Sequence, residues 1–210
     1  MTRWTWPLKD CTPLLPDAPG TFGEVRAEDV HTGVDLYCEL GTEVVAVEDG
    51  EVVAIEWFTG QHVATPDGVP ATWWNDTQIV LIQGASGVVG YGEIDVAVQV
   101  GDRVVAGQTI GVVNKAVLRS FKGRPMVMLH LELYSQLVRD PASPVWAPSS
   151  TVWWAKGETK PEHLLDPTPL LGEGHTRFDL STYDGKSCID PFAPQKPARW
   201  WAVWGGVCPE

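Results

Sequence analysis

Short apolar runs, rich in β-branched residues and separated by turn residues, dominate the chain, and helical periodicity is nearly absent. Runs of this kind are typical of strands. We therefore predict strands at residues 44–47, 51–55, 77–81, 88–94 and 129–134. The Asp49-Gly50 pair predicts a hairpin between the first two runs, and Ser86-Gly87 predicts a turn between the third and fourth.

The rest of the pattern divides the chain into one domain and two extensions. Residues 1–19 are Pro-rich and predict an irregular N-terminal arm, and residues 172–210 predict an irregular C-terminal extension. Residues 20–171 predict an all-β domain with an insertion at residues 135–160. Paired glycines punctuate residues 96–113, as in tightly turned β-structure.

The composition supports a packed domain with an acidic surface. The chain has 210 residues, of which 44% are hydrophobic, and this argues against disorder. The formal net charge of −12 argues against nucleic acid or an anionic membrane as a partner. The sequence has no apolar stretch of about 18 residues or more, and MTRWTWPLKD lacks the apolar region of a signal peptide. We therefore expect neither a membrane span nor a signal peptide in this sequence.

The four cysteines leave the redox state open. None of Cys11, Cys38, Cys188 and Cys208 belongs to a C-x-x-C pair, which argues against a thiolate zinc site or a redox motif. Disulfides Cys188–Cys208 and Cys11–Cys38 are one interpretation, and four reduced thiols are the other.

Three residues have the chemistry of zinc ligands. His31 and Asp35 are four positions apart, so in an extended strand they point to the same face. His130 lies between Leu129 and Leu131, whose side chains point to the opposite face of the strand. Two imidazoles and a carboxylate are what a catalytic zinc needs when its fourth position is left open for water.

The segments around these residues resemble the lysostaphin-type, or LytM-like, zinc metallopeptidases of bacterial cell walls. The similar segments are GTFGEVR, HTGVDL, GTEVVAVEDGEV, the glycine-punctuated segment 100–113, LHLEL and DPTPLL. The resemblance as a whole extends over residues 20–135 and 161–171. The resemblance implies a small antiparallel β-sandwich with a groove across one sheet. It also implies a zinc ion held by His31, Asp35 and His130, peptidoglycan peptides or other small-residue peptides as substrates, and a secreted, periplasmic or cell-wall location.

The chain departs from the family at two positions. Glu93 and Met128 stand where the family has histidines that orient water and stabilise the oxyanion. A methionine cannot transfer protons, whereas a glutamate beside a zinc-bound water can act as a general base. Glu93 is therefore the candidate catalytic residue, and a solvent-facing strand residue is its alternative interpretation.

The predicted groove would be bordered by aromatic and histidine side chains. Trp73, Trp74 and His62 fall in a loop expected at residues 58–76, and Tyr91 and Met128 fall on strands beside the ligands. Aromatic side chains near a groove can stack on sugars or hold extended peptides. Packing of loops onto the sandwich is the alternative for the tryptophans.

Two functions remain in competition. The first is a zinc-dependent endopeptidase, and the second is a catalytically degenerate relative that binds zinc, wall peptide or a protein partner without hydrolysis. A lipoyl- or biotinyl-type carrier is disfavoured because the expected hairpin tip, Glu48-Asp49-Gly50, has no lysine. A phosphocarrier is disfavoured because Asp35 would repel a phosphoryl group.

Overall fold

The computed structural model describes residues 4–11, 14–16, 20–27, 29–63, 74–116, 126–138, 150–172 and 176–178. Within these residues the chain forms strands and one short 3-10 helix, without any α-helix, so the predicted all-β class is confirmed. The elements are β1 (Leu14–Pro16), β2 (Val34–Tyr37), β3 (Thr42–Val45), β4 (Gly50–Thr59), β5 (Thr77–Gly84), β6 (Gly87–Val96), β7 (Arg103–Val104), β8 (Thr109–Val113), β9 (Met128–Tyr134), β10 (Leu164–Leu165), η1 (Thr168–Leu170) and β11 (Thr176–Phe178).

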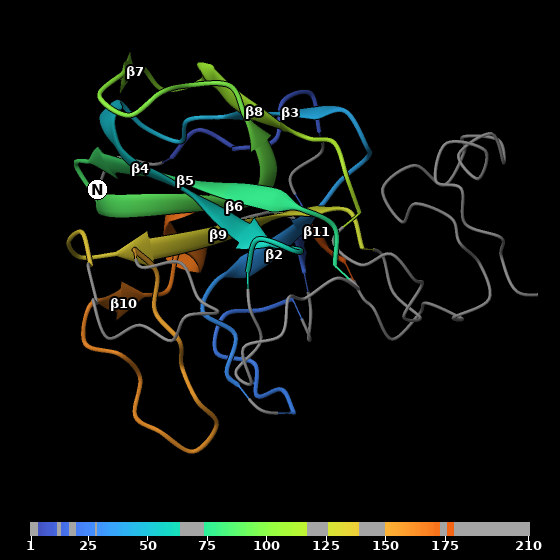
Figure 1. The fold of residues 1–210 in the computed structure, drawn as a ribbon, viewed down its shortest axis with the longest axis vertical. Coiled ribbons are helices and arrows are strands. Elements are labelled where there is room, and N and C mark those ends of the chain that lie inside the picture. The colour runs from blue at the N-terminus through green and yellow to red at the C-terminus, as the bar shows by residue number, and fades with distance from the viewer. Residues whose placement is uncertain are drawn as a thin grey trace, which may run out of the picture.

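The main sheet places β9, the strand that carries His130, between β6 on one side and β2 and β10 on the other. Its strands follow the order β10-β9-β6-β5-β4-β7 (Figure 1), and β2 also pairs with β9. One edge of β9 faces β6, and the other edge faces β2 and β10 in succession. All pairings within this sheet are antiparallel. The predicted turn between residues 77–81 and 88–94 is confirmed, and the two strands that it joins, β5 and β6, pair as a hairpin.

A smaller second layer is built by β3 and β8. β8 also pairs with Asp95 and Val96 at the end of β6, so this long strand belongs to both layers. The principal hydrophobic core takes Val44 and Ile110 from the second layer, and Leu129 and Leu131 from the main sheet. The two layers therefore share one core, as in a sandwich.

The predicted hairpin between residues 44–47 and 51–55 is wrong in its pairing. β3 pairs with β8, and β4 pairs with β5 and β7. Gly50 lies opposite Gly84 at the start of β4, and a Cβ there would lie 2.7 Å from the carbonyl oxygen of Gln83. Gly50 thus permits the start of β4 to lie close to β5, at the point where the chain passes from the second layer to the main sheet.

The N-terminal segment is part of the domain rather than a separate arm. Trp4, Leu8 and Leu15 are buried in the principal core. Backbone hydrogen bonds from Thr5 N to Val47 O and from Lys9 N to Glu43 O hold this segment beside β3. The Pro-rich sequence of this segment has no periodic pattern of apolar residues, so it gave no signal for this packing.

The described part of the predicted insertion also packs on the domain. We call residues 150–155 the covering segment. Val152 and Trp154 of this segment pack against a second hydrophobic cluster that includes Ala54, Leu81 and Tyr134. This cluster lies on the opposite face of the main sheet from the principal core, because Tyr134 alternates with Leu133 along β9.

Other expectations for the chain ends and cysteines are only partly covered by the described residues. Neither Cys11 nor Cys38 forms a disulfide, although both are described, and Cys188 and Cys208 lie outside the described residues. In the predicted C-terminal extension, β11 pairs with β1 in parallel. No helix in the described part of the chain is long and apolar enough to cross a membrane.

Candidate metal centre

Two neighbouring strands bring the predicted ligands together. Asp35 on β2 and His130 on β9 are Cα partners, so their side chains leave the sheet on the same face. His31 lies three residues before β2 begins, rather than within a strand as predicted. His31, Asp35 and His130 are nevertheless grouped as the three residues that could hold a metal ion.

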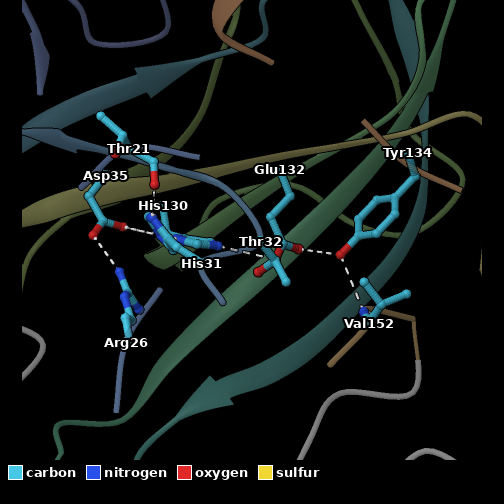
Figure 2. Close-up of polar contacts among 9 residues, drawn as sticks. All are labelled: Thr21, Arg26, His31, Thr32, Asp35, His130, Glu132, Tyr134 and Val152. Carbon is cyan, nitrogen blue, oxygen red and sulfur yellow. Dashed lines mark hydrogen bonds and ion pairs between the residues drawn. The ribbon is translucent and has the colours of Figure 1, made fainter. Parts of the chain in front are cut away.

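The three ligand atoms form a nearly equilateral triangle (Figure 2). His31 Nε2 lies 3.1 Å from His130 Nδ1 and 3.1 Å from Asp35 Oδ1, and His130 Nδ1 lies 3.0 Å from Asp35 Oδ1. Ligand atoms bound to one tetrahedral zinc at ~2.0–2.1 Å are separated by ~3.3 Å. The donor set and its spacing therefore fit zinc. The residues are 2%, 3% and 6% exposed, so the site is well shielded from solvent.

Gly33 allows this convergence. A Cβ at this position would lie 2.5 Å from the carbonyl oxygen of Leu131 and 2.8 Å from His130 Nε2. No side chain fits between the chain entering β2 and β9. The glycine between the first two ligands is therefore required by close approach.

Each imidazole is oriented by an acceptor behind it. His31 Nδ1 lies 2.9 Å from the carbonyl oxygen of Thr21, and His130 Nε2 lies 3.1 Å from Glu132 Oε1. A carbonyl and a carboxylate only accept hydrogen bonds, so these two ring nitrogens carry the hydrogens. When both rings are neutral, as metal binding requires, His31 Nε2 and His130 Nδ1 are therefore the nitrogens directed at the metal position.

The aspartate is oriented in the same way. Arg26 Nη2 donates a hydrogen bond of 3.2 Å to Asp35 Oδ2, which leaves Oδ1 facing the two histidines. Sequence reasoning did not identify Arg26, Thr21 or Glu132. Glu132 had a readable signal, because it lies two residues after His130 on the same face of β9.

The buried charges alter the titration of the site. Burial opposes ionisation of Asp35, but the positive charge of His31 and hydrogen bonds from both histidines hold the pKa of Asp35 well below its usual value. Burial also disfavours charged His130, but hydrogen bonds to Asp35 and Glu132 raise its pKa to about 10. The pKa of Glu132 is lowered, since hydrogen bonding and charge from His130 outweigh its burial. The pocket of carboxylates thus favours a cation at or beside His130.

Glu93 occupies a bulge beside the ligands. Its neighbour Gly92 is the Cα partner of His130, and the register of β6 against β5 shifts at this point. Glu93 is buried and has a left-handed backbone conformation with φ of 67°. The ring of Phe58 lies over Gly92 and contacts His130, with ring centroids 5.4 Å apart. An uncommon backbone conformation beside a candidate metal site is a reason to consider a functional role for Glu93.

The predicted groove residues are distributed differently. Met128 is buried on the same face of β9 as His130, two residues before it. Tyr91 lies in the principal core, where its hydroxyl accepts a hydrogen bond of 2.9 Å from Val47 N, so it is a core residue rather than a groove residue. His62 stacks on Trp57, with ring centroids 4.2 Å apart. Trp74 is half-buried just before β5, and Trp73 lies outside the described residues.

Comparison with known proteins identifies the family. A sequence model described as Peptidase family M23 matches residues 29–141, a range that contains His31, Asp35, Glu93, Met128 and His130. The chain belongs to peptidase family M23. The predicted LytM-like resemblance is thereby confirmed. A comparison with curated proteins gave no match.

Two solved structures resemble this M23 protein. Csd3 from Helicobacter pylori shares 20% identity over 74% of this chain and 37% of its own, with a TM-score of 0.39. A putative M23 peptidase from Pseudomonas aeruginosa shares 16% identity over 80% of this chain and 56% of its own, with a TM-score of 0.36. The M23 protein therefore spans less than two thirds of either solved chain.

Proposed function

We propose that this M23 protein is a zinc-dependent endopeptidase that cleaves small-residue peptides of bacterial peptidoglycan, outside the cytoplasm. The observation that carries the proposal is the triangle of His31 Nε2, Asp35 Oδ1 and His130 Nδ1, with separations of 3.0 to 3.1 Å. The substrate class and the location rest on family membership alone.

The chain's own residues supply the remaining parts of the mechanism. Zinc, when bound, would supply a Lewis acid and lower the pKa of a bound water. Arg26 and Glu132 fix the orientation of Asp35 and His130, so the ligands need little rearrangement to bind. Glu93, placed by its bulge next to the partner of His130, would accept the proton from the attacking water and pass it to the leaving amine.

A second candidate function is binding of zinc and wall peptide without hydrolysis. The specific observation in its favour is buried Met128, on the same face as His130, where the thioether can neither move a proton nor stabilise an oxyanion by a strong hydrogen bond. In this case the groove would serve recognition of a wall peptide or of a protein partner.

Zinc stoichiometry and hydrolysis, measured on the same preparations, distinguish the two functions. We expect one zinc per wild-type chain and loss of zinc in His130→Ala. His163→Ala is the matched control, because His163 contacts Ser135 and Gln136 at the surface and should keep zinc. Retention of zinc by His130→Ala would refute the proposed centre.

Hydrolysis is then tested on purified peptidoglycan and a labelled oligoglycine peptide. We expect turnover by the zinc-loaded wild type and a loss of at least about 100-fold in Glu93→Gln, because a positioned general base contributes about that much. Zinc binding with peptide binding but no turnover would support the second function. Full activity in Glu93→Gln would exclude Glu93 as the base.

A further inference from the structure

A buried carboxylate behind His130 is the centre of a hydrogen-bond network. Glu132 is 1% exposed and accepts three hydrogen bonds: from His130 Nε2 at 3.1 Å, from Thr32 Oγ1 at 2.6 Å and from the Tyr134 hydroxyl at 2.5 Å. Both carboxylate oxygens are thus engaged. A carboxylate held at both oxygens presents a fixed acceptor to the imidazole.

Tyr134 connects this carboxylate to the covering segment. The Tyr134 hydroxyl donates to Glu132 and accepts a long hydrogen bond of 3.4 Å from Val152 N (Figure 2). Tyr134 is fully buried on the same face of β9 as Glu132 and His130. The covering segment is therefore linked to one metal ligand through two side chains.

The same segment also contacts the chain beside the other histidine. Val30 N, one residue before His31, donates a hydrogen bond of 2.8 Å to the carbonyl oxygen of Trp154. The Trp154 ring contacts Phe22, with ring centroids 6.1 Å apart, and Phe22 follows the residue whose carbonyl orients His31. Val152 thus connects the covering segment to the support of His130, and Trp154 connects it to the chain around His31.

We propose that the covering segment braces the metal centre, and that Tyr134 and Glu132 are positioning residues that transmit its docking to His130. The proposal rests on the proposed metal centre. Without the Tyr134 hydroxyl, Glu132 loses a donor in a buried site and is free to reorient, and the His130 ring loses its fixed direction. Linkage then requires that zinc binding and docking of the segment stabilise each other.

Zinc affinity tests the positioning role directly. We expect Tyr134→Phe to weaken zinc binding about 10-fold and Glu132→Gln to weaken it about 10- to 100-fold, as for other residues that orient metal ligands. Tyr91→Phe is the matched control, because it removes an equally buried hydroxyl from the opposite face of the sheet and should leave zinc affinity unchanged. Wild-type affinity in both Tyr134→Phe and Glu132→Gln would overturn the proposal.

Amide hydrogen exchange tests the brace. We expect zinc to slow exchange in residues 150–155 of the wild type and of Tyr91→Phe, and to slow it much less in Tyr134→Phe. An equal effect of zinc in Tyr134→Phe would refute transmission through this side chain.

An NMR measurement without zinc separates this proposal from the proposed function. The His130 Nε2 proton should be protected from exchange in the wild type and lose protection in Glu132→Gln and Tyr134→Phe. If the wild type binds no zinc but shows this pattern, the metal function fails while the positioning network stands. Unchanged protection in both variants would refute the network.

Discussion

At the scale of single residues, His130 lies between two buried carboxylates. Its Nδ1 is 3.0 Å from Asp35 and its Nε2 is 3.1 Å from Glu132. Two carboxylates in a shielded site need a compensating positive charge. A proton on His130 can provide it, and a zinc ion bound at Nδ1 can provide it instead, so protons and metal compete for the same nitrogen.

We expect this competition to appear in the stability of protein stripped of metal by a chelator. The folded pKa of His130, about 10, lies above its ordinary value of 6.5. Its contribution to the free energy of unfolding should therefore be complete below pH 6.5 and be lost as the pH rises towards 10. Urea unfolding between pH 6.5 and 9 measures this decline, and saturating zinc should reduce it because the metal replaces the proton.

Two variants isolate the contribution of His130. His130→Gln should remove the decline, while His163→Gln, which changes a partly exposed histidine outside the site, should retain it. The two carboxylates have lowered pKa values, so their contribution is present above their ordinary pKa and is lost in acid. A wild-type stability that does not fall relative to His130→Gln would contradict a protonated His130.

The candidate ligands could be named from the sequence, whereas of the groups that orient them only Glu132 had a signal in the sequence. His31, Asp35 and His130 are recognisable by side-chain chemistry and spacing. The acceptor for His31 is a backbone carbonyl, which any residue at position 21 would provide, so the sequence gives no signal for it. Tyr91 was misplaced because its neighbour Glu93 suggested a groove position, whereas strand alternation directs Tyr91 into the core.

At the scale of elements, the site depends on how closely β2 approaches β9. We expect Gly33→Ala to weaken zinc binding at least about 10-fold and to destabilise the fold by about 1–3 kcal/mol, because the added methyl group meets the Leu131 carbonyl and the His130 ring. Zinc titration and urea unfolding of the same variant measure both effects.

Gly101→Ala is a suitable control for this substitution. Gly101 has φ of 92°, so alanine there is strained, but a Cβ would meet no atom within 4 Å. Its stability should fall while its zinc affinity stays that of the wild type. Normal zinc affinity in Gly33→Ala would show that the two strands can separate without disturbing the ligands.

Strand positions were easier to predict than strand partners. The runs that became β4, β5 and β6 are visible as β-branched segments, and β9 is visible as an alternation of leucines with polar residues. The short turn at Ser86-Gly87 forces β5 to pair with β6. The Asp49-Gly50 pair gave an equally strong local signal for a hairpin. The predicted hairpin does not form because β3 and β4 pair with strands of different layers.

At the scale of the whole molecule, the N-terminal segment completes the domain. Residues 5–9 run beside β3, with backbone hydrogen bonds from Val45 N to Pro7 O and from Lys9 N to Glu43 O. They cover an edge of the second layer that would otherwise expose unpaired backbone groups. Pro-rich composition concealed this role, because the segment is held by tertiary contacts and not by a periodic pattern.

Trp4 is the residue through which this segment is anchored. It is 5% exposed in the principal core, and its Nε1 donates a hydrogen bond of 3.0 Å to Ser86 Oγ, which itself donates to Glu48. We expect Trp4→Ala to lower the free energy of unfolding by about 3–5 kcal/mol, as for other buried tryptophans. Trp4→Phe keeps an aromatic ring but loses the indole hydrogen bond, and should lower the free energy of unfolding by about 1 kcal/mol relative to the wild type. Urea unfolding with zinc present and absent measures both variants. Trp4 lies in the core, on the side of the sheet away from the candidate ligands, so the zinc affinity of the folded fraction should be unchanged. A loss of only a few tenths of a kcal/mol in Trp4→Ala would mean that the N-terminal segment is dispensable for the fold.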